Sequence, residues 1–205
     1  MKNLIDLVNI YDKSVTEHGD SYKSLLWPTY SHAAERYKVF SDLIGNGSVL
    51  DYGCGCGDFF SFLQENNKNN IYFGVDANEK FIKICKNKFP KTKFETCNFD
   101  GSLSENKIFD FVIANGVFTV RNEITEHNMK KILITIMSNL FNYCNIGICV
   151  NFKFTQPEHK KENLFYISSC EIINIFNNFS DKNLILDNYD KYEYAICLYK
   201  KGINI

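Results

Sequence analysis

The stretch SVLDYGCGCGDF at residues 48–59 places three glycines and two cysteines directly after an apolar run that ends in an acid. Glycine lets the backbone turn sharply and lets a ligand approach without a Cβ in the way. A helix that begins just after such a loop offers free backbone N–H groups to the ligand. The pattern is typical of a strand–loop–helix unit that binds a nucleotide-like molecule, and a tight turn without a ligand is the alternative.

Two acids favour the ligand-binding interpretation of this loop. Asp51 precedes Gly53 by two residues, and Asp76 ends the next apolar run, in YFGVDAN. A carboxylate at the end of the second strand accepts hydrogen bonds from both hydroxyls of a ribose. The sixth position of a dinucleotide GxGxxG pattern is Asp58 here, and an acid is a poor neighbour for a pyrophosphate. The loop therefore suits a ligand without a phosphate better than a dinucleotide.

The order of the predicted elements places this loop in a doubly wound sheet. Strands are expected at 48–51, 71–75, 93–96, 109–114 and 147–152, and helices at 58–65, 78–88, 126–143 and 168–179. This alternation is typical of a parallel sheet with helices on both faces. Two further strand-like runs, 183–189 and 192–200, are joined by so short a turn that they must be antiparallel. We therefore expect a Rossmann-like α/β fold with a seven-stranded, mostly parallel sheet that ends in an antiparallel hairpin.

The segment before the first strand shows helical spacing of apolar residues in two pieces. Thr29 or Ser31 is the predicted N-cap of the second piece. We expect residues 1–44 to form a helical cap over the site and residues 45–205 to form the ligand-binding core, as one structural domain overall.

Composition limits the partners of the chain. The formal net charge is −1 and the lysines are scattered among acids and asparagines, which argues against a nucleic-acid partner. No stretch approaches the roughly 18–20 apolar residues of a membrane span, and the start is too charged for a signal peptide. The eight cysteines contain no CxxC pair and no zinc-finger spacing, so we expect reduced thiols and no metal. A cytoplasmic protein is expected, and its oligomeric state stays open.

Taken together, these motifs resemble the class I S-adenosylmethionine-dependent methyltransferases. The resemblance covers residues from about 29 to 200, and the motifs read VLDYGCGCGDF, YFGVDANEKFIKICKNKFP, KFETCNF and FDFVIANGVF. It implies a methyltransferase whose cofactor is S-adenosyl-L-methionine and whose product is S-adenosyl-L-homocysteine. NGVF stands where base-methylating members of the family carry NPPY, which argues against a nucleic-acid base as the substrate.

The resemblance also implies roles for individual residues. The cofactor-binding set would be Arg36, Asp51, Gly53, Cys54, Gly55, Gly57, Asp76, Ala77, Asn98, Phe99 and Asn115. Within it, Asp76 takes the ribose hydroxyls and Arg36 pairs with the cofactor's carboxylate. Asn98 meets the adenine amino group, with Asp100 as the alternative, and Phe99 lends its backbone N–H to the ring. We interpret Cys54 and Cys56 as small structural residues rather than as nucleophiles or redox groups.

A small polar molecule is the predicted methyl acceptor. A narrower resemblance, to bacterial methyltransferases associated with capsule or surface-polysaccharide decoration such as O-methyl phosphoramidate, is carried by HGDS…W…R, NGVF, ENLFY and YEYAICLYK. It implies transfer to an oxygen or nitrogen of a sugar, a sugar nucleotide or a phosphoramidate. The alternatives are an NAD(P)-binding oxidoreductase and a catalytically silent module that binds the cofactor.

A hydroxyl acceptor calls for a general base, and histidine is the usual choice near neutral pH. His18, with Tyr22 nearby, is the first candidate for a catalytic role, and His32 is the second histidine of the cap. His127 follows the fourth predicted strand and His159 follows the fifth.

Overall fold

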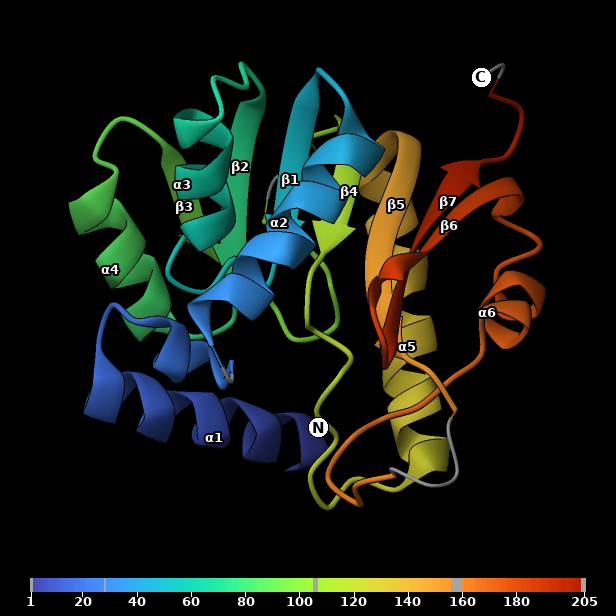
Figure 1. The fold of residues 1–205 in the computed structure, drawn as a ribbon, viewed down its shortest axis with the longest axis horizontal. Helices are drawn as coiled ribbons and strands as arrows, with labels where there is room; N and C mark the ends of the chain where they lie inside the picture. The colour runs from blue at the N-terminus through green and yellow to red at the C-terminus, as the bar shows by residue number, and fades with distance from the viewer. Residues whose placement is uncertain (1, 28, 105–106, 156–159, 204–205) are drawn as a thin grey trace.

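The computed structural model describes residues 2–27, 29–104, 107–155 and 160–203, so His159 lies outside the described residues. In this part of the chain one sheet carries its strands in the order β3-β2-β1-β4-β5-β7-β6 (Figure 1). The strands are β1 (Ser48–Tyr52), β2 (Ile71–Asp76), β3 (Lys93–Thr96), β4 (Phe109–Ala114), β5 (Cys144–Lys153), β6 (Ser180–Asp190) and β7 (Glu193–Lys200). Strands β1 to β5 pair in parallel, and β7 is antiparallel to both β5 and β6. The expected fold class is confirmed.

The helices are α1 (Lys2–His18), α2 (Tyr30–Ile44), α3 (Asp58–Glu65), α4 (Glu79–Lys88), α5 (Glu126–Leu140) and α6 (Ser169–Ile175), with 3₁₀ turns at Tyr22–Leu25 and Phe141–Tyr143. Four of the described helices, α2, α4, α5 and α6, begin at a residue whose side chain caps the first turn. Thr29, one of the two predicted caps, accepts a hydrogen bond from the His32 N–H and starts α2. The predicted helix at 126–143 ends at Leu140, because the next three residues tighten into a 3₁₀ turn.

Strand β5 is longer than predicted. Strand β5 runs beyond the predicted 147–152 at both ends, because it pairs with β4 on one side and with β7 on the other. The predicted helix at 168–179 ends at Ile175, and β6 begins at Ser180, three residues before the predicted start.

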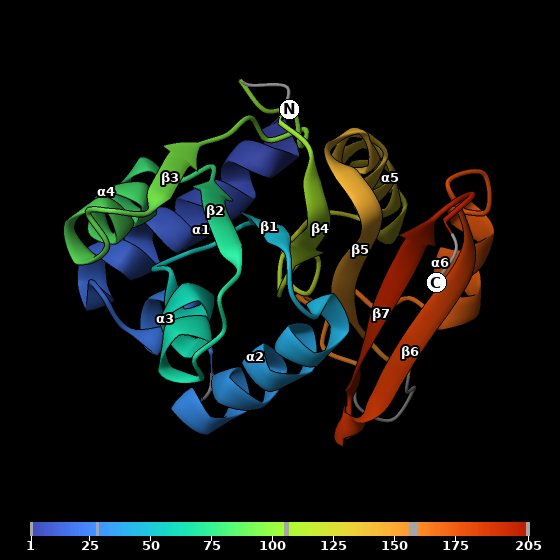
Figure 2. The ribbon, with the colours of Figure 1, turned by 90° about the horizontal axis from the view of Figure 1, so that it is seen from above.

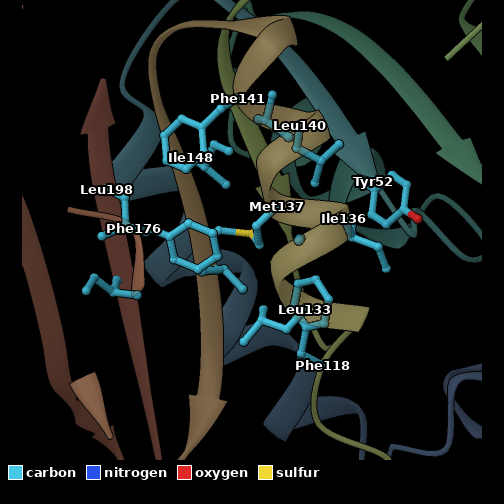
Figure 3. Close-up of a cluster of buried hydrophobic side chains, with 14 of the residues drawn as sticks. Tyr52, Phe118, Leu133, Ile136, Met137, Leu140, Phe141, Ile148, Phe176 and Leu198 are labelled. Atoms are coloured by element: carbon cyan, nitrogen blue, oxygen red, sulfur yellow. The ribbon is translucent and has the colours of Figure 1, made fainter. Parts of the chain in front are cut away.

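Each face of the sheet has its own hydrophobic core. Leu50 points into a cluster with α5 and α6, whereas its neighbour Val49 points into a cluster with α2, α3 and α4. Figure 2 shows α2 and α3 on one side of the sheet and α5 on the other. In Figure 3, Met137 of α5 lies next to Phe176, which follows α6. Because the side chains along the strands are used by these two cores, the residues left to form a site are those at the strand ends.

The N-terminal segment covers the carboxyl edge of the sheet. Figure 1 shows α1 lying across this edge rather than against a face of the sheet. Lys80 ties α1 to α4, since its Nζ donates to Asp12 at 2.8 Å and to Thr16 at 2.8 Å. Helix α2, by contrast, packs into the core through Phe40, which is fully buried. The division into a cap at 1–44 and a core at 45–205 stays a prediction.

Candidate functional site

A cavity of about 500 Å³ lies between α1 and the carboxyl ends of β1, β2, β4 and β5. Its wall is built from α1, residues 25–27, α2, α5 and the loops that follow these strands. In a doubly wound sheet the strand order reverses at this edge, and ligands bind in the crevice outside it. The cavity therefore stands where the sequence predicted the site.

The glycine loop connects β1 to α3 and needs glycine for two reasons. Gly53, Gly55 and Gly57 have φ of 78°, 53° and 74°, in the left-handed region that side chains rarely adopt. A Cβ on Gly53 would come within 2.6 Å of Val117 Cγ2, and one on Gly55 would collide with Leu25. Of the three glycines, only Gly53 lines the cavity, so the other two serve the turn and its packing.

Asp76 links this loop to the start of α4. Its carboxylate accepts hydrogen bonds from the Gly55 N–H at 3.0 Å and from the Asn78 N–H at 2.9 Å. Burial raises the pKa of Asp76 to about 6, although the N–H groups of Asn78, Gly55 and Ala77 act in the opposite direction. Asp76 and Ala77 both line the cavity, and an ionised carboxylate has acceptor sites left for ligand hydroxyls.

Asp51, near the end of β1, is buried and also lines the cavity. Its side chain accepts a hydrogen bond from the Tyr72 hydroxyl. Burial raises the pKa of Asp51 to about 7, the Tyr72 hydrogen bond lowers it, and the nearby Asp76 raises it further. Asp51 thus braces β1 against β2 at the point where the glycine loop begins.

The loop after β3 differs from the expectation for adenine recognition. Asn98 Nδ2 donates to Ser102 Oγ at 3.0 Å, and Asp100 Oδ1 accepts from the Ser102 N–H at 2.9 Å. These hydrogen bonds to Ser102 hold the pKa of Asp100 below its usual range. Neither residue lines the cavity, whereas Cys97 and Phe99 do. Both expected partners of an adenine amine are thus bonded within their own turn.

Part of the cavity wall is apolar. Besides Phe99, it includes Val117 and, from α5, Ile132 and Ile136. A flat aromatic ring gains free energy from burial against such side chains. Sequence reasoning missed these residues, because their helical spacing marks only a buried helix face.

At the other end of the cavity, Arg36 is held by a buried acid. Its Nε and Nη2 donate to the two carboxylate oxygens of Glu193, the first residue of β7. Lys153, the last residue of β5, pairs with the same carboxylate. The Trp27 ring lies 4.0 Å from the guanidinium carbon. Arg36, Lys153 and Trp27 line the cavity, and Glu193 lies behind them, fully buried.

A second acid orients His32. This acid is Asp190, whose Oδ2 lies 2.7 Å from His32 Nε2. The Tyr192 N–H donates to the other oxygen, Asp190 Oδ1, at 2.7 Å. Burial opposes ionisation of Asp190, but the Tyr192 and His32 hydrogen bonds outweigh it and hold the pKa below its usual range. An ionised Asp190 requires that Nε2 carry the proton, which leaves Nδ1 as the basic nitrogen.

Three buried polar atoms of the cavity wall have no hydrogen-bond partner among the described residues. They are Trp27 Nε1, His32 Nδ1 and Asn115 Oδ1. Buried polar groups in folded proteins are nearly always hydrogen-bonded, so each such atom calls for an explanation. A bound polar ligand would supply the missing partners.

Comparison with known proteins identifies the domain. Residues 49–140 match the family model described as "Methyltransferase domain". The match covers somewhat less than half of the 205 residues. It supports the expected class of enzyme and its S-adenosylmethionine cofactor.

The curated relatives match about half of this chain. Carboxy-S-adenosyl-L-methionine synthase of Campylobacter jejuni strain 81-176 is 28% identical over 110 residues, or 51% of this chain and 44% of the relative. The same enzyme of strain RM1221 is 29% identical over 112 residues, or 51% and 46%. The chain spans about half the length of the curated relatives it matches.

Solved structures share the fold of the methyltransferase domain at low identity. Magnesium protoporphyrin IX methyltransferase from Synechocystis PCC 6803, solved with bound SAH, has a TM-score of 0.58 at 14% identity, over 82% of this chain and 81% of its own. PH0226 from Pyrococcus horikoshii OT3 has a TM-score of 0.64 at 17% identity, over 88% and 99%. These likenesses confirm the class I methyltransferase fold.

The first catalytic candidates lie away from the cavity of the methyltransferase domain. His18 ends α1, where its Nε2 is 3.8 Å from Glu17, and neither His18 nor Tyr22 lines the cavity. His127, in the first turn of α5, does not line it either. A catalytic role for His18 and Tyr22 stays a prediction, and the histidine that the fold brings to the cavity is His32.

The cysteines of the glycine loop are buried thiols. Burial raises the pKa of Cys54 well above its usual value and that of Cys56 to about 12, so neither is a thiolate near neutral pH. Cys54 lines the cavity, in agreement with its interpretation as a small wall residue. Among the described residues, no group of three or more His, Cys, Asp or Glu side chains is arranged to hold a metal ion. The described helices also include none that is long and apolar enough to cross a membrane.

Proposed function

We propose that the protein transfers a methyl group from S-adenosylmethionine to an oxygen or nitrogen atom of a small polar metabolite. The observation that carries this proposal is the placement of Asp76. It is a cavity-lining carboxylate at the end of β2, oriented by the Gly55 and Asn78 N–H groups. A carboxylate in that place binds a ribose through both hydroxyls.

The other wall groups fit the remaining parts of the cofactor. Phe99, Ile132 and Ile136 offer an apolar slot for adenine. The unpartnered Asn115 Oδ1 suits the ammonium group of the methionyl part, because a carbonyl oxygen accepts from an ammonium. Arg36 uses two of its five N–H donors on Glu193, and we assign its remaining donors to the cofactor's carboxylate.

The cofactor supplies a methyl group on a positively charged sulfur, so alignment and exclusion of water are left to the protein. Helix α1 and Trp27 cover the cavity and exclude water from it. We assign the general base for a hydroxyl acceptor to His32. Its Nδ1 takes the hydroxyl proton while Asp190 holds Nε2–H and stabilises the imidazolium that results.

Sugars, sugar nucleotides and phosphoramidates remain the proposed acceptors. The narrower resemblance of HGDS…W…R, NGVF, ENLFY and YEYAICLYK to capsule-associated methyltransferases supports this proposal. The same resemblance supports action in the cytoplasm on a small molecule rather than on a nucleic acid or a membrane.

Isothermal titration with S-adenosylhomocysteine, S-adenosylmethionine and NAD tests the proposal. We expect micromolar binding of both adenosyl ligands, no response to NAD, and loss of binding in Asp76→Ala. Asp12→Asn, a charge change at an exposed ion pair with Lys80, is the matched control. Silence with both adenosyl ligands in a folded sample would contradict the proposal, and binding of NAD instead would favour the oxidoreductase.

A further inference from the structure

The cavity has an acidic end and a basic end. Asp51 and Asp76 belong to β1 and β2, on one side of β4 in the sheet. Lys153 ends β5, on the other side of β4, and Lys161 lies in the loop that follows β5. The cofactor proposed above occupies the acidic end, which leaves the basic end for the methyl acceptor.

The lining of the basic end is cationic. Lys153 and Lys161 line the cavity, and no described carboxylate lines it at this end. Arg36 lines it too, but its remaining donors are assigned to the cofactor's carboxylate. Glu193 and Asp190 do not line the cavity, so the two lysines are the charges that a ligand at this end meets. An enclosed surface with an excess of one charge attracts ligands of the other sign.

Lys153 is fixed rather than mobile. Its ammonium pairs with Glu193, and only 16% of its side chain is exposed. Glu193 also accepts from Asn151 Nδ2 at 3.3 Å, and Asn151 Oδ1 accepts from the Gly116 N–H at 2.7 Å. An ammonium has three donors, so Lys153 has donors left for a ligand after the one to Glu193. Such a positioned cation loses little entropy when it binds.

The tryptophan beside these cations also lacks an acceptor. Trp27 Nε1 is buried and has no partner among the described residues, although Trp27 lines the cavity. An indole N–H can only donate. The group that completes this end must therefore carry a hydrogen-bond acceptor, as a phosphate or a carboxylate does.

We propose that Lys153, Lys161 and Trp27 form a subsite for an anionic group, a phosphate or a carboxylate, on the methyl acceptor. This inference rests on the proposed function, since it takes the occupant to be the acceptor. It narrows the acceptor from any small polar metabolite to an anionic one. A neutral sugar would leave the positive charge of the wall uncompensated.

Binding of small anions tests the subsite. The probes are inorganic phosphate and malonate, titrated against the thermal unfolding midpoint with sodium chloride at equal ionic strength as reference. We expect at least one probe to raise the midpoint above the chloride reference, both with and without saturating S-adenosylhomocysteine. Lys161→Gln should weaken that binding about tenfold, as expected for the loss of one charge-assisted hydrogen bond. A larger gain with phosphate than with malonate assigns the group to a phosphate, and the reverse assigns it to a carboxylate.

Two further variants keep the test decisive. Lys153→Gln should also weaken anion binding, and if it unfolds, the exposed Lys161 still gives the answer. Lys130→Gln, on α5 and paired with Glu171 outside the cavity, removes the same charge and should bind anions like the unmodified protein. No gain over chloride, or equal gains in all variants, would overturn the subsite. Failure of the proposed function is seen separately, as absent binding of S-adenosylhomocysteine.

Discussion

The Arg36 guanidinium and the Glu193 carboxylate form a two-point ion pair between residues 157 positions apart in the sequence. Their side chains are 7% and 0% exposed. The pair joins α2, which comes before the first strand in the sequence, to β7, the last strand in the sequence. Lys153, at the end of β5, pairs with the same Glu193 carboxylate. The Glu193 carboxylate therefore holds three separate segments at one end of the cavity.

Glu193→Gln should cost stability, because it leaves two buried cations without their shared anion. Breaking a buried ion pair by removing one partner typically costs about 3–5 kcal/mol, and we expect a loss of that size in the free energy of unfolding. Urea denaturation measures it. Glu171→Gln breaks the exposed pair with Lys130 and should cost less than about 1 kcal/mol. Equal losses in the two variants would show that the Arg36–Glu193 pair contributes no more than a surface contact.

The part of the site that depends on local sequence could be predicted. The glycine loop and Asp76 are specified by strand ends and by backbone conformations that only glycine adopts easily, and these are visible in VLDYGCGCGDF and YFGVDAN. The adenine contact of Asn98 stays a prediction, because a local turn competes for its side chain: the Asn98 and Asp100 side chains bond to Ser102.

The basic end depends on contacts between distant segments and could not be predicted in the same way. Glu193 and Asp190 flank the last hairpin turn and read as ordinary polar turn residues. One signal was available for Glu193. It begins a strand, EYAICLYK, that is apolar on both faces, so a charge at its start is buried between neighbouring strands and needs a cation. Which cation supplies that charge depends on the packing of α2.

Asp51 should make the ligand-free protein less stable as the pH rises. The pKa of Asp51 is about 7 in the folded protein against an ordinary value of 3.8, so between these values the folded state holds a proton that the unfolded chain has released. The stability from this group is fully present below about pH 4 and is lost as the pH rises through about 7, by about 4 kcal/mol in all.

Asp51→Asn should reduce this dependence and leave the part that comes from Asp76, whose pKa is also raised, since an amide does not titrate and its oxygen still accepts from Tyr72. Urea denaturation between pH 4 and pH 8 measures the slope. Asp12→Asn, the matched change at an exposed ion pair, should keep the slope of the unmodified protein. An unchanged slope in Asp51→Asn would show that other groups cause it.

His32 should act as the general base when the acceptor is a hydroxyl. Its Nε2 is committed to Asp190, its Nδ1 has no partner among the described residues, and the residue lines the cavity. General-base catalysis contributes about 10²–10⁴-fold, so His32→Gln should lower kcat about a hundredfold or more in a methyl-transfer assay. It should leave the affinity for S-adenosylhomocysteine within about twofold, because the contacts proposed for the cofactor are made by Asp76, Asn115 and Arg36 and not by His32.

The rival candidate is tested in the same assay. His18 ends α1 outside the cavity wall, so His18→Gln separates a base that acts in the cavity from one that would need α1 to move. Full turnover by His32→Gln would rule out His32. A hundredfold loss in His18→Gln alone would instead restore the candidate that the HGDS segment first suggested.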